Sequence, residues 1–281
     1  MDMYHKENIK IERKIRILSW DVGIYNLAYC LLEFDSSYIK DIVDINDINS
    51  FAKMCNIRDW GIITLISPDA TKTEKKKYNL LKVGKSLFEQ LDDKKKTSFN
   101  EIDYVLIENQ PCLKNPKMKS IQMMLYSYFI MRGLIDCNMN KTIIENDNTI
   151  DIDTGSNMNS DDKGICCIDC MNGSMGHNHT DSVNSVDNIN DTTCRKIDIL
   201  FISASGKLKY CKDKEIDEKF NHLKSKYTRR KKMAIEYCKL FMQHDSVNID
   251  LFNSHKKKDD LADSYLQGVQ YLFKNRKSFV K

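Results

Sequence analysis

Residues 14–34 read KIRILSWDVGIYNLAYCLLEF, and this stretch decides the fold. It contains two β-rich runs, Lys14–Trp20 and Asn26–Phe34, with a short connection between them. Apolar, β-branched runs of this length, separated by a connection that contains glycine, predict a hairpin or a pair of adjacent strands. The first run is followed at once by Asp21, so the sequence places a carboxylate at the end of a buried strand.

Strand-like and helix-like patterns continue along the rest of the chain. Further strands are predicted at Trp60–Ile66, Tyr104–Glu108 and Ile197–Ser203, and helices at Lys75–Leu91, at Met118–Arg132 with Gly133 as its end, at Lys226–His244, and from about Lys258 to Phe273. The resulting order is β-β-β-α-β-α-β-α-α, with an insertion before the last strand. It predicts an α/β fold in which helices flank a mixed β-sheet, and this order resembles the ribonuclease H-like fold.

Residues 145–195 interrupt the pattern. They are rich in Asn, Asp, Ser, Thr and Gly and hold ten acidic but only two basic side chains. This composition predicts a disordered or loosely ordered low-complexity insertion, which divides one domain made of residues 1–144 and 196–281. Potential zinc ligands lie within it, namely Cys166, Cys167, Cys170, His177, His179 and Cys194. Because no second close cysteine pair follows, the spacing alone does not decide whether the insertion binds zinc.

The composition fits a globular protein, since 41% of the 281 residues are hydrophobic and 30% are charged. No apolar stretch approaches the roughly 18 residues of a membrane span, and Met1–Lys14 lacks the apolar core of a secretory signal. We therefore expect an intracellular protein that is not secreted, with its cysteines reduced. Outside the insertion the chain is strongly basic, which favours a polyanionic partner such as nucleic acid, although a general bias toward Lys, Asn, Ile and Asp would give the same excess.

Two of the candidate catalytic carboxylates follow predicted strands. Asp21 begins the pattern D-x-G-x-x-N, in which Gly23 allows close approach of the backbone to a phosphate. Glu108 ends an apolar run, so its burial would be costly without a cation or hydrogen-bond donors. The alternatives are a turn-capping Asp and an exposed edge-strand Glu. Actin-like and sugar-kinase ATPases use a similar D-x-G turn, but no second glycine-rich loop is found among the 10 glycines.

Three further carboxylates begin the last predicted helix. Asp260 and Asp263 are three residues apart, whereas Asp259 and Asp263 are four apart, and either pair would share one helix face. Periodicity therefore does not choose between Asp259 and Asp260. The alternative reading is an ordinary acidic first turn. Clustered carboxylates repel one another less when a divalent cation neutralises them, and hard oxygen ligands select Mg²⁺ or Mn²⁺ over zinc.

In combination these segments resemble the RuvC-like Holliday junction resolvases, most closely their poxvirus and giant-virus branch with its fungal mitochondrial relatives. The matching stretches are SWDVGIYNLAY at 19–29, IENQP at 107–111, KNPKMKSIQM at 114–123 and KKDDLADS at 257–264. The insertion is not part of the resemblance. The resemblance implies Asp21, Glu108, Asp260 and Asp263 as catalytic metal ligands, which favours Asp260 over Asp259. It also implies that Lys258 lies close to the reacting groups.

The function implied by this resemblance is a Mg²⁺-dependent endonuclease that acts as a homodimer on branched, four-way DNA junctions in recombination or replication. Mn²⁺ substitutes for Mg²⁺ in this expectation, and two ions bind per active site. If the source is viral, the protein works where that virus replicates its DNA. The helix at 121–131, IQMMLYSYFIM, is apolar around most of its circumference, so it is interpreted either as a core helix or as a dimer contact.

Basic residues around these motifs are candidate DNA contacts, although a run of charge is also typical of a solvated helix face. The candidates are Lys114, Lys117, Lys119, Arg229, Arg230, Lys231 and Lys232. Two other functions stay open at this stage. One is a ribonuclease H-like nuclease that acts on RNA or on RNA–DNA hybrids, and the other is a junction-binding protein without catalytic activity.

Overall fold

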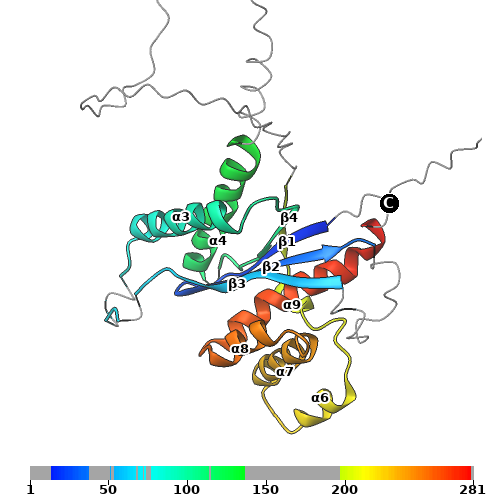
Figure 1. Ribbon diagram of the computed structural model, residues 1–281. Coiled ribbons are helices and arrows are strands. Elements are labelled where there is room, and N and C mark those ends of the chain that lie inside the picture. Colours follow the sequence, from blue (N-terminus) through cyan, green and yellow to red (C-terminus); the bar gives the residue numbers. More distant parts are fainter. Residues whose placement is uncertain are drawn as a thin grey trace, which may run out of the picture.

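The computed structural model describes residues 14–37, 51, 54–67, 69–71, 73, 77–113, 115–136 and 197–279. The predicted insertion at 145–195, with its cysteines and histidines, lies outside the described residues, and so does Lys114. Helices cover both faces of a central β-sheet (Figure 1). In the described part of the chain, no helix has both the length and the apolar character that crossing a membrane requires.

The sheet contains the predicted strands in a mixed arrangement. Its strands are β1 (Lys14–Asp21), β2 (Asn26–Asp35), β3 (Cys55–Thr64), β4 (Tyr104–Glu108) and β5 (Asp198–Ile202), in the spatial order β3-β2-β1-β4-β5. Strand β2 is antiparallel to β1 and β3, whereas β4 is parallel to β1 and β5. The predicted α/β fold, in which helices flank a mixed sheet that begins with an N-terminal hairpin, is confirmed. Because β5 pairs with β4, the segments before and after the insertion share one sheet.

The helices form two layers. Helices α3 (Leu80–Thr97) and α4 (Pro116–Phe129) lie on one side of the sheet, and α7 (Lys226–Phe241), α8 (Ser246–Ser254) and α9 (Lys258–Asn275) lie on the other (Figure 1). A short helix, α6 (Lys214–Lys219), precedes α7. Neither α6 nor α8 is predicted from the sequence, since each is too short to show a clear helical period.

Several predicted boundaries are wrong: the third strand is Cys55–Thr64 rather than Trp60–Ile66, α3 ends at Thr97 rather than Leu91, and α7 ends at Phe241 rather than His244. Two further helix ends differ for reasons that the structure shows. Helix α3 begins at Leu80 rather than near Lys75, because the Asn79 side chain caps it by accepting a hydrogen bond from the backbone N–H of Leu81 at 2.8 Å. The next helix does not end at Gly133, since a π-helical turn, Ile130–Ile135, continues α4 through that position. Gly133 allows close packing there instead, because a Cβ atom would lie 2.9 Å from Cδ1 of Ile197.

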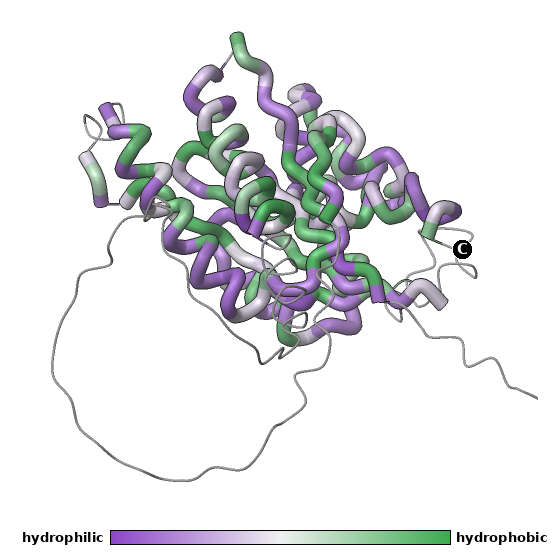
Figure 2. Tube along the Cα trace, turned by 90° about the horizontal axis from the view of Figure 1, so that it is seen from above, coloured by the Kyte–Doolittle hydropathy of each residue, from purple (hydrophilic) through white to green (hydrophobic). Residues whose placement is uncertain are grey.

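Strand β1 is buried on both faces, which explains its nearly continuous apolar sequence. Ile15 and Ile17 pack into the core formed with α7, α8 and α9. Leu18 and Trp20 point the other way, into the core formed with α3 and α4. Figure 2 shows the hydrophobic segments gathered in the interior between the more hydrophilic outer helix turns. The end of β1 is therefore held firmly from both sides, and Asp21 with it.

Helix α9 packs closely against β1 and β2. The buried Gln267 side chain donates from Nε2 to the Ser19 hydroxyl at 3.1 Å and to the Trp20 carbonyl at 3.2 Å. At Gly268, a Cβ atom would lie only 2.6 Å from Cδ1 of Leu32, so glycine is needed for this approach. These contacts fix how deeply α9 lies on the sheet, and hence where its acidic first turn projects.

Candidate active site

Asp21 and Glu108 lie side by side at one edge of the sheet. Strands β1 and β4 are parallel, and Trp20 is in register with Ile107, so the next residue of each strand reaches the same edge. A cavity of about 630 Å³ opens at this edge, and both carboxylates line it. The parallel pairing of two strands far apart in the sequence thus brings the first two candidate residues together.

The first turn of α9 completes the acidic wall. Asp260 and Asp263 line the same cavity as Asp21 and Glu108. Asp259 instead accepts a hydrogen bond from Lys231 of the neighbouring helix α7. The geometry therefore places Asp260, and not Asp259, among the cavity carboxylates.

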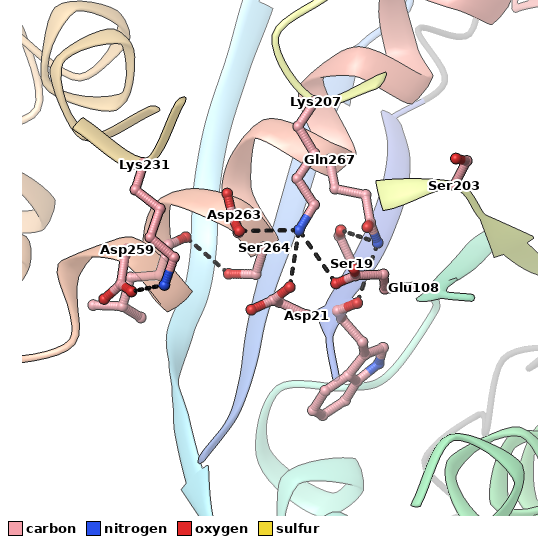
Figure 3. A network of polar contacts seen from close by, with 12 residues as sticks. Ser19, Asp21, Glu108, Ser203, Lys207, Lys231, Asp259, Asp263, Ser264 and Gln267 are labelled. Carbon is pink, nitrogen blue, oxygen red and sulfur yellow. Dashed lines mark hydrogen bonds and ion pairs between the residues drawn. The ribbon is translucent and has the colours of Figure 1, made fainter. Parts of the chain in front are cut away.

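Lys207 lies at the centre of this acidic cluster (Figure 3). Its Nζ is 2.8 Å from Oδ1 of Asp21, 3.3 Å from Oε2 of Glu108 and 3.3 Å from Oδ2 of Asp263. The lysine side chain is only 7% exposed. Three carboxylates from three different elements thus converge on one buried ammonium group.

Lys207 is not among the residues predicted from the sequence, although its position after a strand is a signal that could have indicated it. Strand β5 is parallel to β4, so its C-terminal end reaches the edge of the sheet that holds Glu108. A single 3₁₀ turn, Ala204–Gly206, then leads to Lys207. A basic residue shortly after a strand parallel to an acidic strand is therefore placed to meet the carboxylates.

The two strand-end carboxylates have opposite pKa shifts. Burial opposes ionisation of Asp21, but the ammonium of Lys207 holds the pKa of this carboxyl below its ordinary value. Burial, together with the hydrogen bond and charge of Asp21, raises the pKa of Glu108 to about 8, even though Lys207 opposes the shift. Of the two carboxyl groups, Asp21 is therefore the one that ionises more readily.

The two α9 carboxyl groups that line the cavity, Asp260 and Asp263, also have raised pKa values. Burial and the neighbouring charges of Asp259 and Asp21 raise the pKa of Asp260 to about 6. Burial, with the charge of Asp21, raises the pKa of Asp263 despite the opposing charge of Lys207. Burial would lower the pKa of Lys207, but the carboxylates around it raise it above the ordinary value. One ammonium thus stabilises, but does not balance, the four acidic groups.

The donor set of the cavity suits a hard divalent cation. Four carboxyl groups supply oxygen ligands of the kind that Mg²⁺ and Mn²⁺ prefer. The Lys207 ammonium already holds the position of a cation between three of them. Among the described residues, no group of three or more Asp, Glu, His or Cys side chains is arranged so that it could hold a metal ion without moving. Metal binding at this cavity therefore requires Lys207 to move away from at least some of its carboxylate partners.

Helix α7 contributes a basic wall to the cavity. Arg230 and Lys231, both candidate DNA contacts, line it. Arg229 instead donates to the Asp217 carbonyl at 3.4 Å, and Lys232 is exposed. Lys258 donates to the carbonyl of His255 at 2.9 Å and is not among the described residues that line the cavity. The lysine beside the carboxylates is Lys207, so this geometry does not support the sequence-based role of Lys258.

The basic residues of α4 have different surroundings. Lys119 donates to Oδ1 of Asn109 at 3.2 Å and to Oε1 of Gln122 at 3.1 Å. The same Gln122 oxygen accepts the backbone N–H of Gln110 at 2.8 Å. These contacts hold the connection that follows Glu108. Lys117 places its Nζ 4.7 Å from the ring centre of Tyr78.

The connection between β1 and β2 forms another part of the cavity wall. Gly23 lies in it, and a Cβ atom there would come within 2.2 Å of the Asn26 carbonyl oxygen. Glycine is thus required at this position by the contact between Gly23 and Asn26 within the chain, and not by the approach of a phosphate. The D-x-G-x-x-N pattern is explained by this turn, which directs the chain from Asp21 back into β2.

This chain is similar to a viral protein in sequence and aligns weakly with a viral resolvase in structure. No family model matches this chain. An uncharacterized protein of Acanthamoeba polyphaga mimivirus is 30% identical over 210 residues, which is 73% of this chain but 38% of that protein. This chain therefore spans well under half the length of that relative. The crystal structure of Fowlpox virus resolvase with Holliday junction DNA aligns with a TM-score of 0.42 and 14% identity, over 95% of this chain and 100% of the resolvase chain.

Proposed function

We propose that this chain is a structure-selective endonuclease that resolves four-way DNA junctions by Mg²⁺-dependent phosphodiester hydrolysis. The observation that supports it most is the meeting of four carboxyl groups, from β1, β4 and α9, in one cavity. The basic side chains of α7 that line the same cavity, Lys226, Arg230 and Lys231, supply a surface for the DNA backbone. The proposal includes Mn²⁺ as a substitute for Mg²⁺ and two ions per active site.

In this proposal the acidic side chains of the cavity bind the metal ions, and the basic side chains bind the DNA backbone. Asp21, Glu108, Asp260 and Asp263 would hold the ions, which when bound supply an activated water and stabilise the leaving 3′ oxygen. Arg230 lines the same cavity, where it donates to the Ser205 carbonyl at 3.1 Å, and it would bind the phosphate that is cleaved. No protein nucleophile is needed for this chemistry.

The proposed active form is a homodimer. A four-way junction has approximate two-fold symmetry, and its resolution needs two cuts, which a two-fold protein dimer can make symmetrically. Helix α4 buries Ile121 and Leu125 but leaves Met123 40% exposed, and Met131 in the following turn is 52% exposed. These side chains are candidates for the subunit contact. Light scattering of the purified protein should give twice the chain mass, and a monomer that cleaves junctions would contradict the dimer.

A cleavage assay on three substrates tests the function. A synthetic four-way junction, a linear duplex of the same sequence and an RNA–DNA hybrid are incubated with the protein in Mg²⁺ or in EDTA. We expect paired nicks near the branch point in Mg²⁺, with 5′ phosphate and 3′ hydroxyl ends, and little cleavage of the duplex. Preferential cleavage of the hybrid would instead favour a ribonuclease acting on RNA. Tight junction binding without cleavage in Mg²⁺ would favour a non-catalytic binding protein.

Variants of the acidic cluster separate catalysis from binding. The substitutions Asp21→Asn, Glu108→Gln, Asp260→Asn and Asp263→Asn should each abolish cleavage yet retain junction binding, because phosphate contacts elsewhere persist. Asp250→Asn, on helix α8 and away from the cavity, is the matched control and should cleave like the wild type. Wild-type cleavage by any of the four variants would remove that residue from the proposed site.

A further inference from the structure

An aromatic ring stands exposed beside the acidic cavity. Tyr227 lies in the first turn of α7, lines the cavity and is 69% exposed. Lys231, one turn further along the helix, places its Nζ 5.0 Å from the centre of the Tyr227 ring. A cation at this distance is attracted to the ring face, so Lys231 covers part of the ring and helps to fix its orientation.

The lysine beside the ring is itself fixed by a second helix. Lys231 donates to the carboxylate of Asp259, in the first turn of α9. The adjacent residue, Asp260, lines the cavity. Tyr227, Lys231 and Asp259 therefore form a continuous series of contacts, which we call the tyrosine platform. It ties an exposed ring on α7 to the helix that supplies two of the cavity carboxylates.

The surroundings of the ring match one kind of ligand. Lys226 and Arg230 of the same helix also line the cavity, so cations flank the aromatic surface. Cations that bind a phosphate backbone, combined with a ring on which bases stack, are the usual means of binding unpaired nucleic acid. A linear duplex keeps its bases stacked in pairs and offers no free base face. When the arms of a four-way junction are held apart, the base pairs at the branch point lose their stacking partner on one side, so a base face becomes accessible.

We propose that Tyr227 stacks on an unstacked base at the branch point, next to the phosphate that enters the acidic cavity. The inference rests on the proposed function and deepens it, because it states which feature of the DNA is read and by which side chain. The branch is recognised by a ring beside the carboxylates, so cleavage and recognition of the branch occur at the same place. Tyr25, in the connection between β1 and β2, also lines the cavity but is less exposed, at 41%, and it serves as the comparison.

The test uses a four-way junction with 2-aminopurine at the branch point, because the fluorescence of this base falls when it stacks on an aromatic ring. Binding is measured in Ca²⁺ with the full-length protein, and cleavage is measured separately in Mg²⁺. Tyr227→Leu removes the ring, Tyr227→Phe keeps it, and Tyr25→Leu removes the comparison ring. Since Tyr227 is exposed, its substitution should leave folding intact, which a thermal unfolding curve verifies. Junctions with 2-aminopurine in the middle of an arm serve as the control for the position of the probe.

The platform predicts that Tyr227→Leu weakens junction binding by about 5- to 150-fold, which is the effect of losing one base stack, and removes the fluorescence quench at the branch. Tyr227→Phe should retain both, and affinity for linear duplex should not change in either variant. The inference is overturned if Tyr227→Leu quenches like the wild type, if Tyr227→Phe is as weak as Tyr227→Leu, or if only Tyr25→Leu removes the quench. In each of these cases wild-type junction cleavage would leave the proposed function standing. A wild-type protein without preference for the junction would overturn the function and the inference together.

Discussion

Replacing Lys207 by methionine should strongly destabilise the protein when no divalent metal is present. The Nζ atom of Lys207 is the shared partner of the carboxylates of Asp21, Glu108 and Asp263, at 2.8 to 3.3 Å. Methionine preserves most of the volume of the side chain but removes its charge. Removing one partner of a buried ion pair costs about 3–5 kcal/mol, because the remaining charge is left buried without compensation.

The expected loss is large enough to measure by thermal unfolding. In a domain of about 150–250 residues, 1 kcal/mol shifts the melting temperature by about 2–4 °C, so Lys207→Met should lower it by about 6–20 °C in EDTA. Added Mg²⁺ should then raise the melting temperature of the variant more than that of the wild type, since the ammonium no longer competes for the carboxylates. A cation that binds only the folded protein at 100 times its Kd contributes about 2.7 kcal/mol.

The loss should also depend on pH with a definite sign. Glu108 has its pKa raised to about 8 in the folded protein, so between its ordinary pKa and that value the folded state binds more protons than the unfolded state. Stability in EDTA should therefore fall as the pH rises through this window. In Lys207→Met the fall should be steeper, because the ammonium that favours the ionised carboxylates is absent.

Circular dichroism melts in EDTA at pH 5.5 and 8, with and without Mg²⁺, measure all three effects. The control is Lys209→Met, which removes an exposed lysine two positions further along and should leave the melting temperature almost unchanged. A Lys207→Met protein that melts within about 2 °C of the wild type in EDTA at pH 8 would refute the reasoning. It would mean that the buried carboxylates are stabilised by something other than this ammonium.

Three other perturbations have defined outcomes. Gln267→Met should lower the free energy of unfolding by about 1–3 kcal/mol, because the buried Ser19 hydroxyl and Trp20 carbonyl lose their hydrogen-bond donor. It should also raise the Mg²⁺ concentration needed for cleavage, and unchanged Mg²⁺ dependence would limit Gln267 to a stabilising role. Replacing residues 147–193 by a short Gly/Ser linker should leave Mg²⁺-dependent cleavage intact, because this composition cannot build much of a core. Loss of folding would show that the segment is structural, and zinc analysis of the intact protein would then be the next measurement. Arg230→Gln should reduce both junction affinity and single-turnover cleavage, because Arg230 lines the cavity. Lys232 is exposed and does not line it, so Lys232→Gln should only weaken binding and lower its salt dependence by about one counterion. Equal effects of the two substitutions on cleavage would contradict the placement of α7.

The sequence predicts well those parts of the molecule that are determined by residues close together along the chain. Strands β1 and β4 are apolar because both of their faces are covered, and this burial is visible as continuous apolar runs. A carboxylate that directly follows such a run must lie at a sheet edge. Asp21 and Glu108 can therefore be placed at strand ends from the sequence alone, although the edge that they share is known only once the strands are seen to be parallel.

Lys207 could not be identified in this way, because its partners are remote. It lies 186 residues from Asp21 and 99 residues from Glu108 along the chain. The local sequence, SASGK at 203–207, has no apolar period and no unusual charge. Lys258 stands beside the acidic pair in sequence and is the more obvious choice, but adjacency on a helix directs its ammonium to the carbonyl of His255 instead.

The choice between Asp259 and Asp260 shows why the helix period alone was insufficient. Consecutive residues of a helix differ in direction by about 100°, so rotating α9 by one residue would exchange the two carboxylates between the cavity and helix α7. The rotation is fixed two turns away, where Gln267 donates to β1 and Gly268 fits beneath Leu32. Any larger residue at Gly268 must displace the Leu32 side chain, push α9 away from the sheet or turn it. The acidic residues that face the cavity are therefore selected by a tertiary contact that contains no acidic residue at all.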